Sequence, residues 1–495
     1  MDVRNRRHDH IGQSALREFP LPLNNLSAVL HVKADRVEVE RFDSVSGDAK
    51  LFAQGLVRWG KIDGPDQPRT TRAEIGLTVE NLPIDRDLAQ ALPADTQERL
   101  EQLGLAGKLN GTGVVTVNLP SGGQNSTDYR FDMKLTDGVF RPREWKTQVD
   151  HITSLVRITP DEIRIDDAKG QRDDSAIAAN GSVGIKSGGV PVVNGEVTAT
   201  KLLLDAPLHD SLPTPARAAW DAVKPSGHVT TRLKWNGSIE DAAAWHLTLD
   251  AGNDVSVEPT FFPRRFDALT GTVRASSTTV ELDAIKAKLA DSDVQLDGTG
   301  ALGPASNQQL WKLKLGAAKL PIDEKLLVAL PTGLAGAIRD AKFAGTVDLT
   351  VRRLDWSSEP DPADAAKVKT TVGFDAGVKF ADARAEFGLP ISSAVGGLEM
   401  SGSVNDDGPT DLAGAVSLDS FKVADIDATA GSARLTSQDS ANLLHIVDVR
   451  AKLAGGDLSG EVAIDQSNVQ STRWARTSAS GRPTSARSPA TVTRP

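Results

Sequence analysis

The chain has 495 residues, of which 39% are hydrophobic and only 4% aromatic, and its formal net charge is −10. A net negative charge argues against nucleic-acid binding, because affinity for phosphate needs a basic surface. Cysteine is absent, which excludes disulfides, thiolate metal sites and cysteine nucleophiles. With so few aromatic residues, any large apolar surface must be built mainly from aliphatic side chains.

The N-terminal part of the chain shows an incomplete pattern. Residues 1–18 lack the apolar core of a signal peptide and are predicted to be disordered. Residues 19–81 follow the order of the closing half of a repeat, so we expect a truncated first module there. No stretch approaches the ~18–20 apolar residues that a membrane-spanning helix needs.

An internal repeat organises the rest of the chain. Three segments bracketed by prolines each run into a glycine and then a strand, and their second prolines, Pro93, Pro213 and Pro331, stand 120 and 118 residues apart. Each segment is predicted as a short helix pair, with Asp85 and Asp323 at positions where a helix favours a carboxylate. We expect these helices to cover one edge of a sheet, which would otherwise invite aggregation.

The repeat sets the predicted domain boundaries. Complete modules are expected at 82–203, 204–319 and 320–466, the last with an additional hairpin near 411–440. Residues 467–495 are rich in Ser, Thr, Pro and Arg and are predicted to be a disordered tail.

Apolar and polar residues alternate between the helix segments. Val229, Thr231 and Leu233 share one face of a predicted strand, whereas Thr230 and Arg232 share the other. Such alternation is typical of antiparallel strands with one buried and one wet face. At roughly ten to twelve residues per strand and turn, we expect about 40 strands.

Four Asn-Gly dipeptides predict tight two-residue hairpin turns, since this pair supplies the positive φ angles that such turns require. They lie at 110–111, 180–181, 194–195 and 236–237.

The predicted fold is mainly β: a long, antiparallel, coiled β-groove built from repeats, with one short helix pair per module of ~118 residues. Separate β-sandwiches fit the alternation equally well, because they also need one wet and one dry face. If the dry faces stay on one side, they line a groove. The predicted lining is Val115, Val117, Leu119, Phe131, Met133, Leu135, Leu233, Trp235, Trp245, Leu247, Leu249, Leu313, Leu315, Val347, Leu349 and Val351.

The order of a proline-bracketed helix, a Gly-x-Val strand, hairpins, a Phe/Pro-bearing strand and a Gly-x-Val closure resembles the AsmA-like superfamily. This superfamily of bacterial envelope proteins includes TamB-type and other bridge-like proteins built from repeating β-grooves. Segments 82–93 and 320–331 carry the resemblance, which covers residues 19–466. Two departures stand out: the usual N-terminal anchor is absent, and the segment after Gln466 has no counterpart.

The resemblance implies a non-enzymatic, periplasmic protein, tethered to the inner membrane through an anchor that this chain lacks. Its groove would shield or conduct the acyl chains of phospholipids or other lipids between membranes, or support outer-membrane assembly. Lipid would then be the partner, with no cofactor.

Catalytic signals are poor. No Gly-x-Ser-x-Gly elbow, phosphate loop, His-Glu-x-x-His or dinucleotide motif is present, so no catalytic, cofactor-binding or metal-binding residue is predicted. His8-Asp9-His10 could hold a metal ion, but solvated side chains are the simpler interpretation. Asp166-Asp167 and Asp173-Asp174 could act as paired carboxylates. Aspartate is common beside turns, however, and charge on a wet face is the default.

Three function classes therefore stay open. The first is a lipid-handling groove, and the second is a structural or adhesin-like β-repeat protein with closed cores. The third is a carbohydrate-active enzyme with β-modules, in which tryptophans such as Trp145 and Trp311 would form a sugar-binding platform. Packing or groove lining explains those tryptophans more simply.

Overall fold

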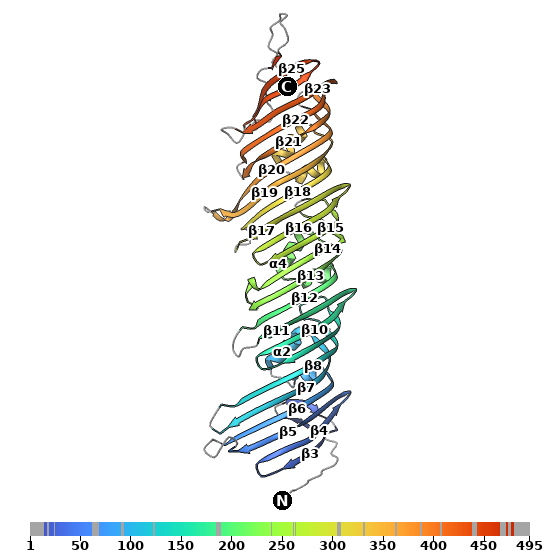
Figure 1. The fold of residues 1–495 in the computed structure, drawn as a ribbon, viewed down its shortest axis with the longest axis vertical. Helices are drawn as coiled ribbons and strands as arrows, with labels where there is room; N and C mark the ends of the chain where they lie inside the picture. The colour runs from blue at the N-terminus through green and yellow to red at the C-terminus, as the bar shows by residue number, and fades with distance from the viewer. Residues whose placement is uncertain are drawn as a thin grey trace, which may run out of the picture. The chain divides into compact units, whose positions relative to one another are not determined.

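The computed structural model describes residues 14–16, 19–23, 25–61, 69–90, 94–121, 124–184, 190–238, 240–260, 262, 264–303, 308–329, 332–361, 364–386, 389–405, 408–437, 443–465, 472–473 and 477–479. It is mainly β, with 73% strand and 10% helix. Its main element is a long, open antiparallel sheet of 23 strands, β3 to β25 (Figure 1). The predicted fold class is confirmed.

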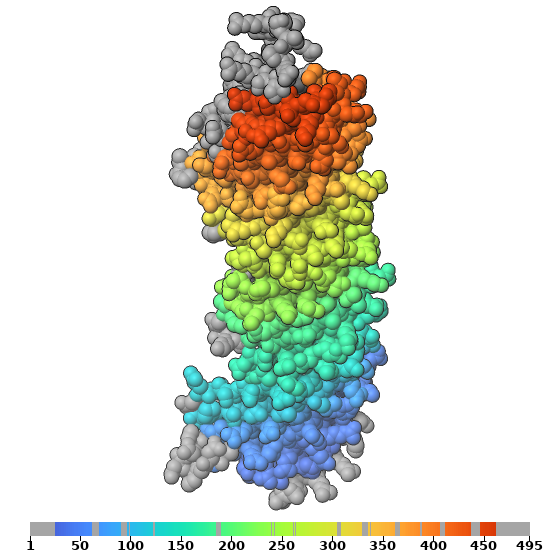
Figure 2. Space-filling view, turned by 45° about the horizontal axis from the view of Figure 1, so that its top comes forward, coloured from blue at the N-terminus to red at the C-terminus, as the bar shows by residue number. Residues whose placement is uncertain are grey.

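The chain divides into two compact units. The first comprises residues 1–221, 225–255 and 275–277, and the second comprises 222–224, 256–274 and 278–495. Within each unit, the colours of Figure 2 change stepwise along the surface, because consecutive strands lie side by side.

In the first unit, each strand from β3 to β14 pairs antiparallel with the next strand in the sequence. A separate hairpin, β1 (Ser14–Leu16) and β2 (Phe19–Leu23), precedes them. The strands are β3 (Ser27–Val32), β4 (Arg36–Ser46), β5 (Ala49–Gly60), β6 (Thr70–Pro83), β7 (Leu105–Pro120), β8 (Ser126–Phe140), β9 (Val149–Ile158), β10 (Glu162–Arg172), β11 (Ser175–Gly184), β12 (Val192–Leu203), β13 (His228–Ser238) and β14 (Trp245–Val257).

The second unit repeats this arrangement from β16 to β25. The strands are β15 (Phe266–Ser276), β16 (Thr279–Leu289), β17 (Ser292–Leu302), β18 (Gln309–Pro321), β19 (Thr346–Asp361), β20 (Asp364–Glu386), β21 (Pro390–Asn405), β22 (Gly408–Val423), β23 (Ile426–Ser437), β24 (Leu443–Leu453) and β25 (Gly456–Asp465). β22 and β23 form a hairpin in the region where an additional one is expected. β26 (Thr472–Arg473) and β27 (Thr477–Ala479) fall within the predicted tail and pair with β25.

Helix pairs form at all three proline-bracketed segments. They are α1 (Arg86–Gln90) with α2 (Ala94–Leu103), α3 (Ala206–Ser211) with α4 (Thr214–Val223), and α5 (Glu324–Ala329) with α6 (Thr332–Asp340); a short 3₁₀ turn, η1 (Ala242–Ala244), precedes β14. Asp85, Asp205 and Asp323 each accept a hydrogen bond from the backbone N–H three residues later, at 3.0, 3.0 and 2.9 Å. The same N-cap thus starts each helix pair, since it satisfies an N–H that the helix leaves unpaired.

The glycine of each repeat closes the helix pair back onto the sheet. The carbonyls of Gly107, Gly227 and Gly345 accept hydrogen bonds from the N–H of Ile84, Leu204 and Ile322. All three glycines have positive φ, of 143°, 102° and 143°. A side chain at Gly227 would also lie 2.4 Å from the carbonyl oxygen of Asp254. These conditions explain why the repeat keeps glycine at this point.

The strands have two kinds of end, which we name by what lies there. At the turn edge, strands are joined by connections such as 158–162 and 276–279; at the helix edge, they run into the helix pairs or short turns such as 172–175 and 289–292. Near the helix edge, many strands carry a residue with φ of about +50°, and the register of pairing commonly shifts beside it. These residues are Asn81, Asp137, His151, Asp167, Lys201, Ala268, Ala284, Lys319, Ser393, Ala430 and Asp448.

Such β-bulges bend a strand and increase its twist. Because they recur at the same edge of successive strands, their bends add up and curl that edge of each unit's sheet. A coiled sheet is the expected result.

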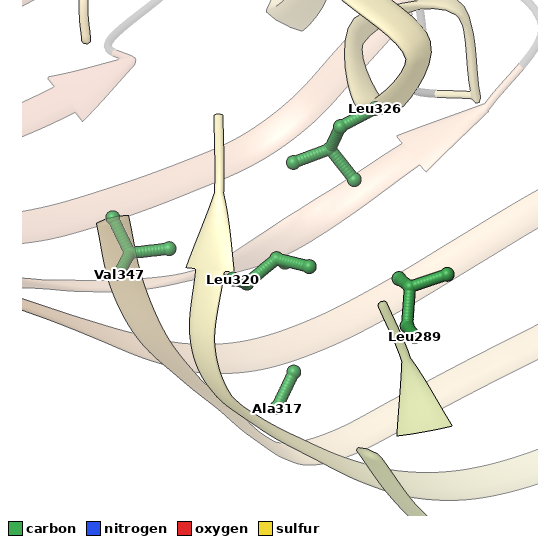
Figure 3. Close-up of a cluster of buried hydrophobic side chains, with 5 residues drawn as sticks. All are labelled: Leu289, Ala317, Leu320, Leu326 and Val347. Atoms are coloured by element: carbon green, nitrogen blue, oxygen red, sulfur yellow. The ribbon is translucent and has the colours of Figure 1, made fainter. Parts of the chain in front are cut away.

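The main buried clusters lie at this curled edge. In the second unit, Leu289, Ala317, Leu320 and Val347 of β16, β18 and β19 meet Leu326 of α5 (Figure 3). Farther along, Phe421 packs with four alanines from β20, β21, β23 and β24. In the first cluster α5 packs over inner strands of the sheet and not along an outermost strand, so the expectation that the helices cover one edge of a sheet is wrong for this helix pair.

Two further predictions were wrong. None of the four Asn-Gly dipeptides is a turn: they lie within β7, β11, β12 and β13. Their glycines instead relieve crowding, because a side chain at Gly111 would lie 2.2 Å from the Asp132 carbonyl oxygen and one at Gly181 2.5 Å from the Asn194 carbonyl oxygen. The strands consequently run on past these points, so the sheet has 23 strands and not about 40.

We predict that Gly227→Ala destabilises the first unit by about 1–3 kcal/mol, because alanine is strained at φ 102° and has no room beside Asp254. Gly76→Ala is the matched control, since its nearest neighbour outside the adjacent residues is 3.7 Å away. The midpoint of urea unfolding should fall for Gly227→Ala alone. Equal midpoints for the two variants would contradict the role assigned to this glycine.

Candidate functional site

Neighbouring strands align their apolar residues into rows that cross the sheet. In the first unit, one row follows Ala179, Val197, Leu233 and Leu247 from β11 to β14. The next row follows Gly181, Gly195, Trp235 and Trp245 on the same strands. We call the surface made by these rows the apolar face.

The apolar face is partly open to solvent in the region that lies away from the helix edge. Val197 is 42% exposed and Leu233 is 38% exposed, although both lie in the middle of one row. Residues of the same strands nearer the helix edge, Ala199 and Val229, are buried. The described residues therefore form a half-open surface, with its buried part along the helix edge.

The second unit has the same arrangement. Leu296, Leu315, Val351, Ala376 and Met400 form one row from β17 to β21. Nearer the turn edge, another row runs along Gly300, Trp311, Trp356, Val372 and Val404. Most of these side chains are half-buried, whereas Ala317 and Val347 near the helix edge are buried.

The opposite, polar face carries ion pairs between neighbouring strands. Arg157 of β9 and Arg130 of β8 donate to Asp132 at 2.6 and 3.1 Å, and together they hold the pKa of that carboxyl below its ordinary value. In the second unit, Arg352 likewise lowers the pKa of Asp375 by donating hydrogen bonds to it. These pairs are exposed, so each adds little stability. They mark this face as the one in contact with water.

A buried ion pair fixes α3 at the helix edge. The Arg172 side chain is only 5% exposed, and its Nη2 lies 2.6 and 2.7 Å from the two carboxylate oxygens of Asp205. Arg172 also donates to Thr147 Oγ1 and to the Leu203 carbonyl oxygen, at 2.6 and 3.2 Å. Because Asp205 is the N-cap of α3, this network links the helix to the end of β10.

The second unit makes a related pair, in which Arg264 donates to Asp323 at 3.1 Å. Nothing in the sequence distinguishes Arg172 or Arg264 from other arginines, because an isolated arginine carries no local signal of burial.

The sixteen predicted lining residues lie on strands β7, β8, β13, β14, β18 and β19, in the apolar rows of these strands. Met133, Leu135 and Val347 are buried, Leu119 and Leu233 are exposed, and the others are half-buried. Sequence reasoning missed Val197 and Trp356. The alternation of Val193, Gly195 and Val197 on β12 was a signal that could have identified the first.

The predicted alternatives to a groove find less support in the geometry. Asp166 and Asp167 lie inside β10, not beside a turn, and pair with Arg164 at 3.1 Å and Lys169 at 2.7 Å. Asp173 and Asp174 form the tight turn between β10 and β11. His8-Asp9-His10 lies outside the described residues.

No cluster suited to a metal ion occurs in the part of the chain that the structure describes. No described helix is long and apolar enough to cross a membrane.

Comparison with known proteins gives no match: no family model, no curated protein and no solved structure is similar to this chain.

We predict that Arg172→Ala destabilises the first unit by about 3 kcal/mol, because it leaves the partly buried Asp205 carboxylate without its cation. Arg164→Ala, which removes an exposed ion pair in the same strand, should cost less than about 1 kcal/mol. Urea unfolding of both variants measures the difference. Similar small shifts would show that the Arg172 network does not hold α3 in place.

Proposed function

We propose that this protein is not an enzyme and that its apolar face shields or conducts the acyl chains of lipids. The observation that carries the proposal is the half-open state of the apolar rows, seen most directly in Val197 and Leu233. Monomeric soluble proteins rarely expose large contiguous apolar patches unless these bind something.

The chemistry of the rows favours an alkyl chain as the occupant. On β11 to β14, the positions that face the apolar side are every second residue of Ile177 to Val183, Val193 to Ala199, Val229 to Trp235 and Trp245 to Ala251. None of these positions carries a charged side chain. Each CH₂ group moved from water onto such a surface contributes about 0.8 kcal/mol without any directed polar contact. Repeated rows of similar composition would bind a chain at many places with similar strength, which suits movement along the sheet.

The setting of this function is also a proposal. The order of elements in residues 19–466 resembles the AsmA-like superfamily, and the coiled sheet with repeated helix pairs agrees with that architecture. We propose that the protein acts in the periplasm of the bacterial envelope, tethered to the inner membrane. There it would carry lipid between membranes or support outer-membrane assembly.

A structural or adhesin-like protein with closed cores is the competing proposal. Its strands would bury their apolar residues along the whole strand length. Two buried clusters of the described residues instead lie at the helix edge. A helix contributes to one of them, and Phe343 of the α6–β19 connection packs against the other. The apolar rows nearer the turn edge are therefore partly exposed and accessible to a ligand.

We predict that Val115→Asp greatly reduces the phospholipid that co-purifies with the protein, because it places a charge in an apolar row of β7. Val114→Asp is the matched control: Val114 is the adjacent residue, is 45% exposed and lies opposite Arg130 on the polar face. Native mass spectrometry after mild extraction measures the lipid retained. At least a fivefold loss is expected for Val115→Asp and almost none for Val114→Asp.

A second pair repeats the comparison in β13, with Leu233→Asp as the test and Arg232→Asp as the control. Lipid retained equally by test and control variants that still fold would contradict the assignment of the apolar face. A wild-type protein free of lipid would contradict the proposed function as a whole.

A further inference from the structure

The tryptophans are not spread evenly over the fold. Five of the eight in the chain lie on the apolar face close to the turn edge, in both units. They are Trp59, Trp235, Trp245, Trp311 and Trp356. Trp145 and Trp220, in contrast, lie at the helix edge, in the β8–β9 connection and in α4.

In the first unit, Trp235 and Trp245 lie opposite each other on β13 and β14. The indole Nε1 of Trp235 donates to the carbonyl oxygen of Ser238 at 3.3 Å, at the end of its strand. Trp59 is 37% exposed and its Nε1 donates to the carbonyl oxygen of Ala34, in a turn of the same edge, at 2.9 Å. Both rings thus lie on the apolar face while their N–H groups bond to polar atoms of the turn edge.

The second unit repeats the pattern. Trp311 and Trp356 lie opposite each other on β18 and β19. Trp311 Nε1 donates to Gln309 Oε1 at 3.1 Å, again toward the turn edge. Its ring covers Gly300 of β17, where a side chain would lie 2.7 Å from the ring. The sheet therefore makes room for the indole at this position.

Tryptophan has an apolar body and one polar N–H, so it is favoured where an apolar region meets water or lipid headgroups. The five tryptophans mark such a boundary at the turn edge of each unit. At the other edge, the helix pair and the bulges close the face, as the buried Leu320, Leu326 and Val347 show.

The strip between the two edges has the length of a lipid chain. Trp235 is six residue steps along β13 from the buried Val229, which corresponds to about 20 Å of strand. One leaflet of a bilayer has a hydrocarbon thickness of about 15 Å. An acyl chain that follows the strand direction can therefore lie wholly between the tryptophans and the closed edge.

We propose that each bound lipid lies with its polar headgroup at the turn edge and its acyl chain along the strands toward the helix edge, with the tryptophans at the level where chain and headgroup join. This inference rests on the proposed lipid-binding function and adds an orientation to it. In this orientation the headgroup remains in water, and the acyl chain is the part of the lipid that contacts the apolar face.

Fluorescence quenching by spin-labelled lipid tests the orientation. The protein is the full chain with Trp145, Trp220 and Trp474 replaced by Phe, so that only the five turn-edge tryptophans emit. The probes are phosphatidylcholines with a doxyl label at carbon 5 or carbon 16 of one acyl chain. Carbon 5 lies near the headgroup, so we expect the first probe to quench at least about twofold more than the second, at equal bound lipid measured by native mass spectrometry.

The matched control keeps Trp145, Trp220 and Trp474 and replaces the five turn-edge tryptophans with Phe, which preserves ring packing. Its emission should lose the preference for the carbon-5 label. Bound lipid with equal quenching by both probes, or stronger quenching by the carbon-16 probe in the first protein, overturns the orientation while leaving lipid binding intact. Absence of bound lipid in wild type overturns the proposed function itself.

Discussion

The requirement to keep one face of a sheet away from water organises this structure. Every module alternates apolar and polar residues, so each strand has a dry face and a wet face. A β-sandwich meets the requirement with a second sheet. Here each unit meets it in part by curling and by the short helix pairs, of which the chain has three. What remains between the curled edge and the turn edge is an aliphatic surface whose residues are mostly half-buried and in part exposed.

The curl depends on backbone conformations that most residues avoid. Ala284, Lys319 and Ala430 hold φ near +50° without being glycine, at a cost on the order of 1 kcal/mol each. Burial of neighbours such as Leu289 and Leu320 offsets this cost, since each large aliphatic side chain contributes about 1.5–3 kcal/mol when buried. The bulges and the buried clusters therefore stabilise each other, and both lie at the same edge.

Much of this arrangement could be predicted from the sequence. Period-two alternation identified the faces of strands such as β13, and the spacing of Pro93, Pro213 and Pro331 located the helix pairs. The Asn-Gly dipeptides misled because glycine has two uses, a positive φ in a turn and the absence of a side chain in a crowded sheet, and local sequence does not separate them. Gly181 and Gly195 face each other across β11 and β12, a fact that only the register reveals.

The β-bulges could not be predicted from the sequence for a related reason. Alanine, lysine, serine and aspartate all occupy bulge positions, so no residue type identifies them. The buried Arg172 was equally hidden, because its partner Asp205 is 33 residues away. Trp235 and Trp245 are predicted as residues of the apolar face. The position of five tryptophans near one edge could not be predicted, because it depends on strand direction, which alternates along the chain.

Pairing between consecutive strands alone has a consequence for how the protein can form. From β3 to β14 and from β16 to β25, each strand pairs with the strand before or after it in the chain, so strand pairing in these ranges does not depend on a distant segment. A growing sheet of this kind can add one hairpin at a time during synthesis, with each finished hairpin offering an edge to the next. Insertion or loss of a whole module would then alter the length of the product without requiring a new core.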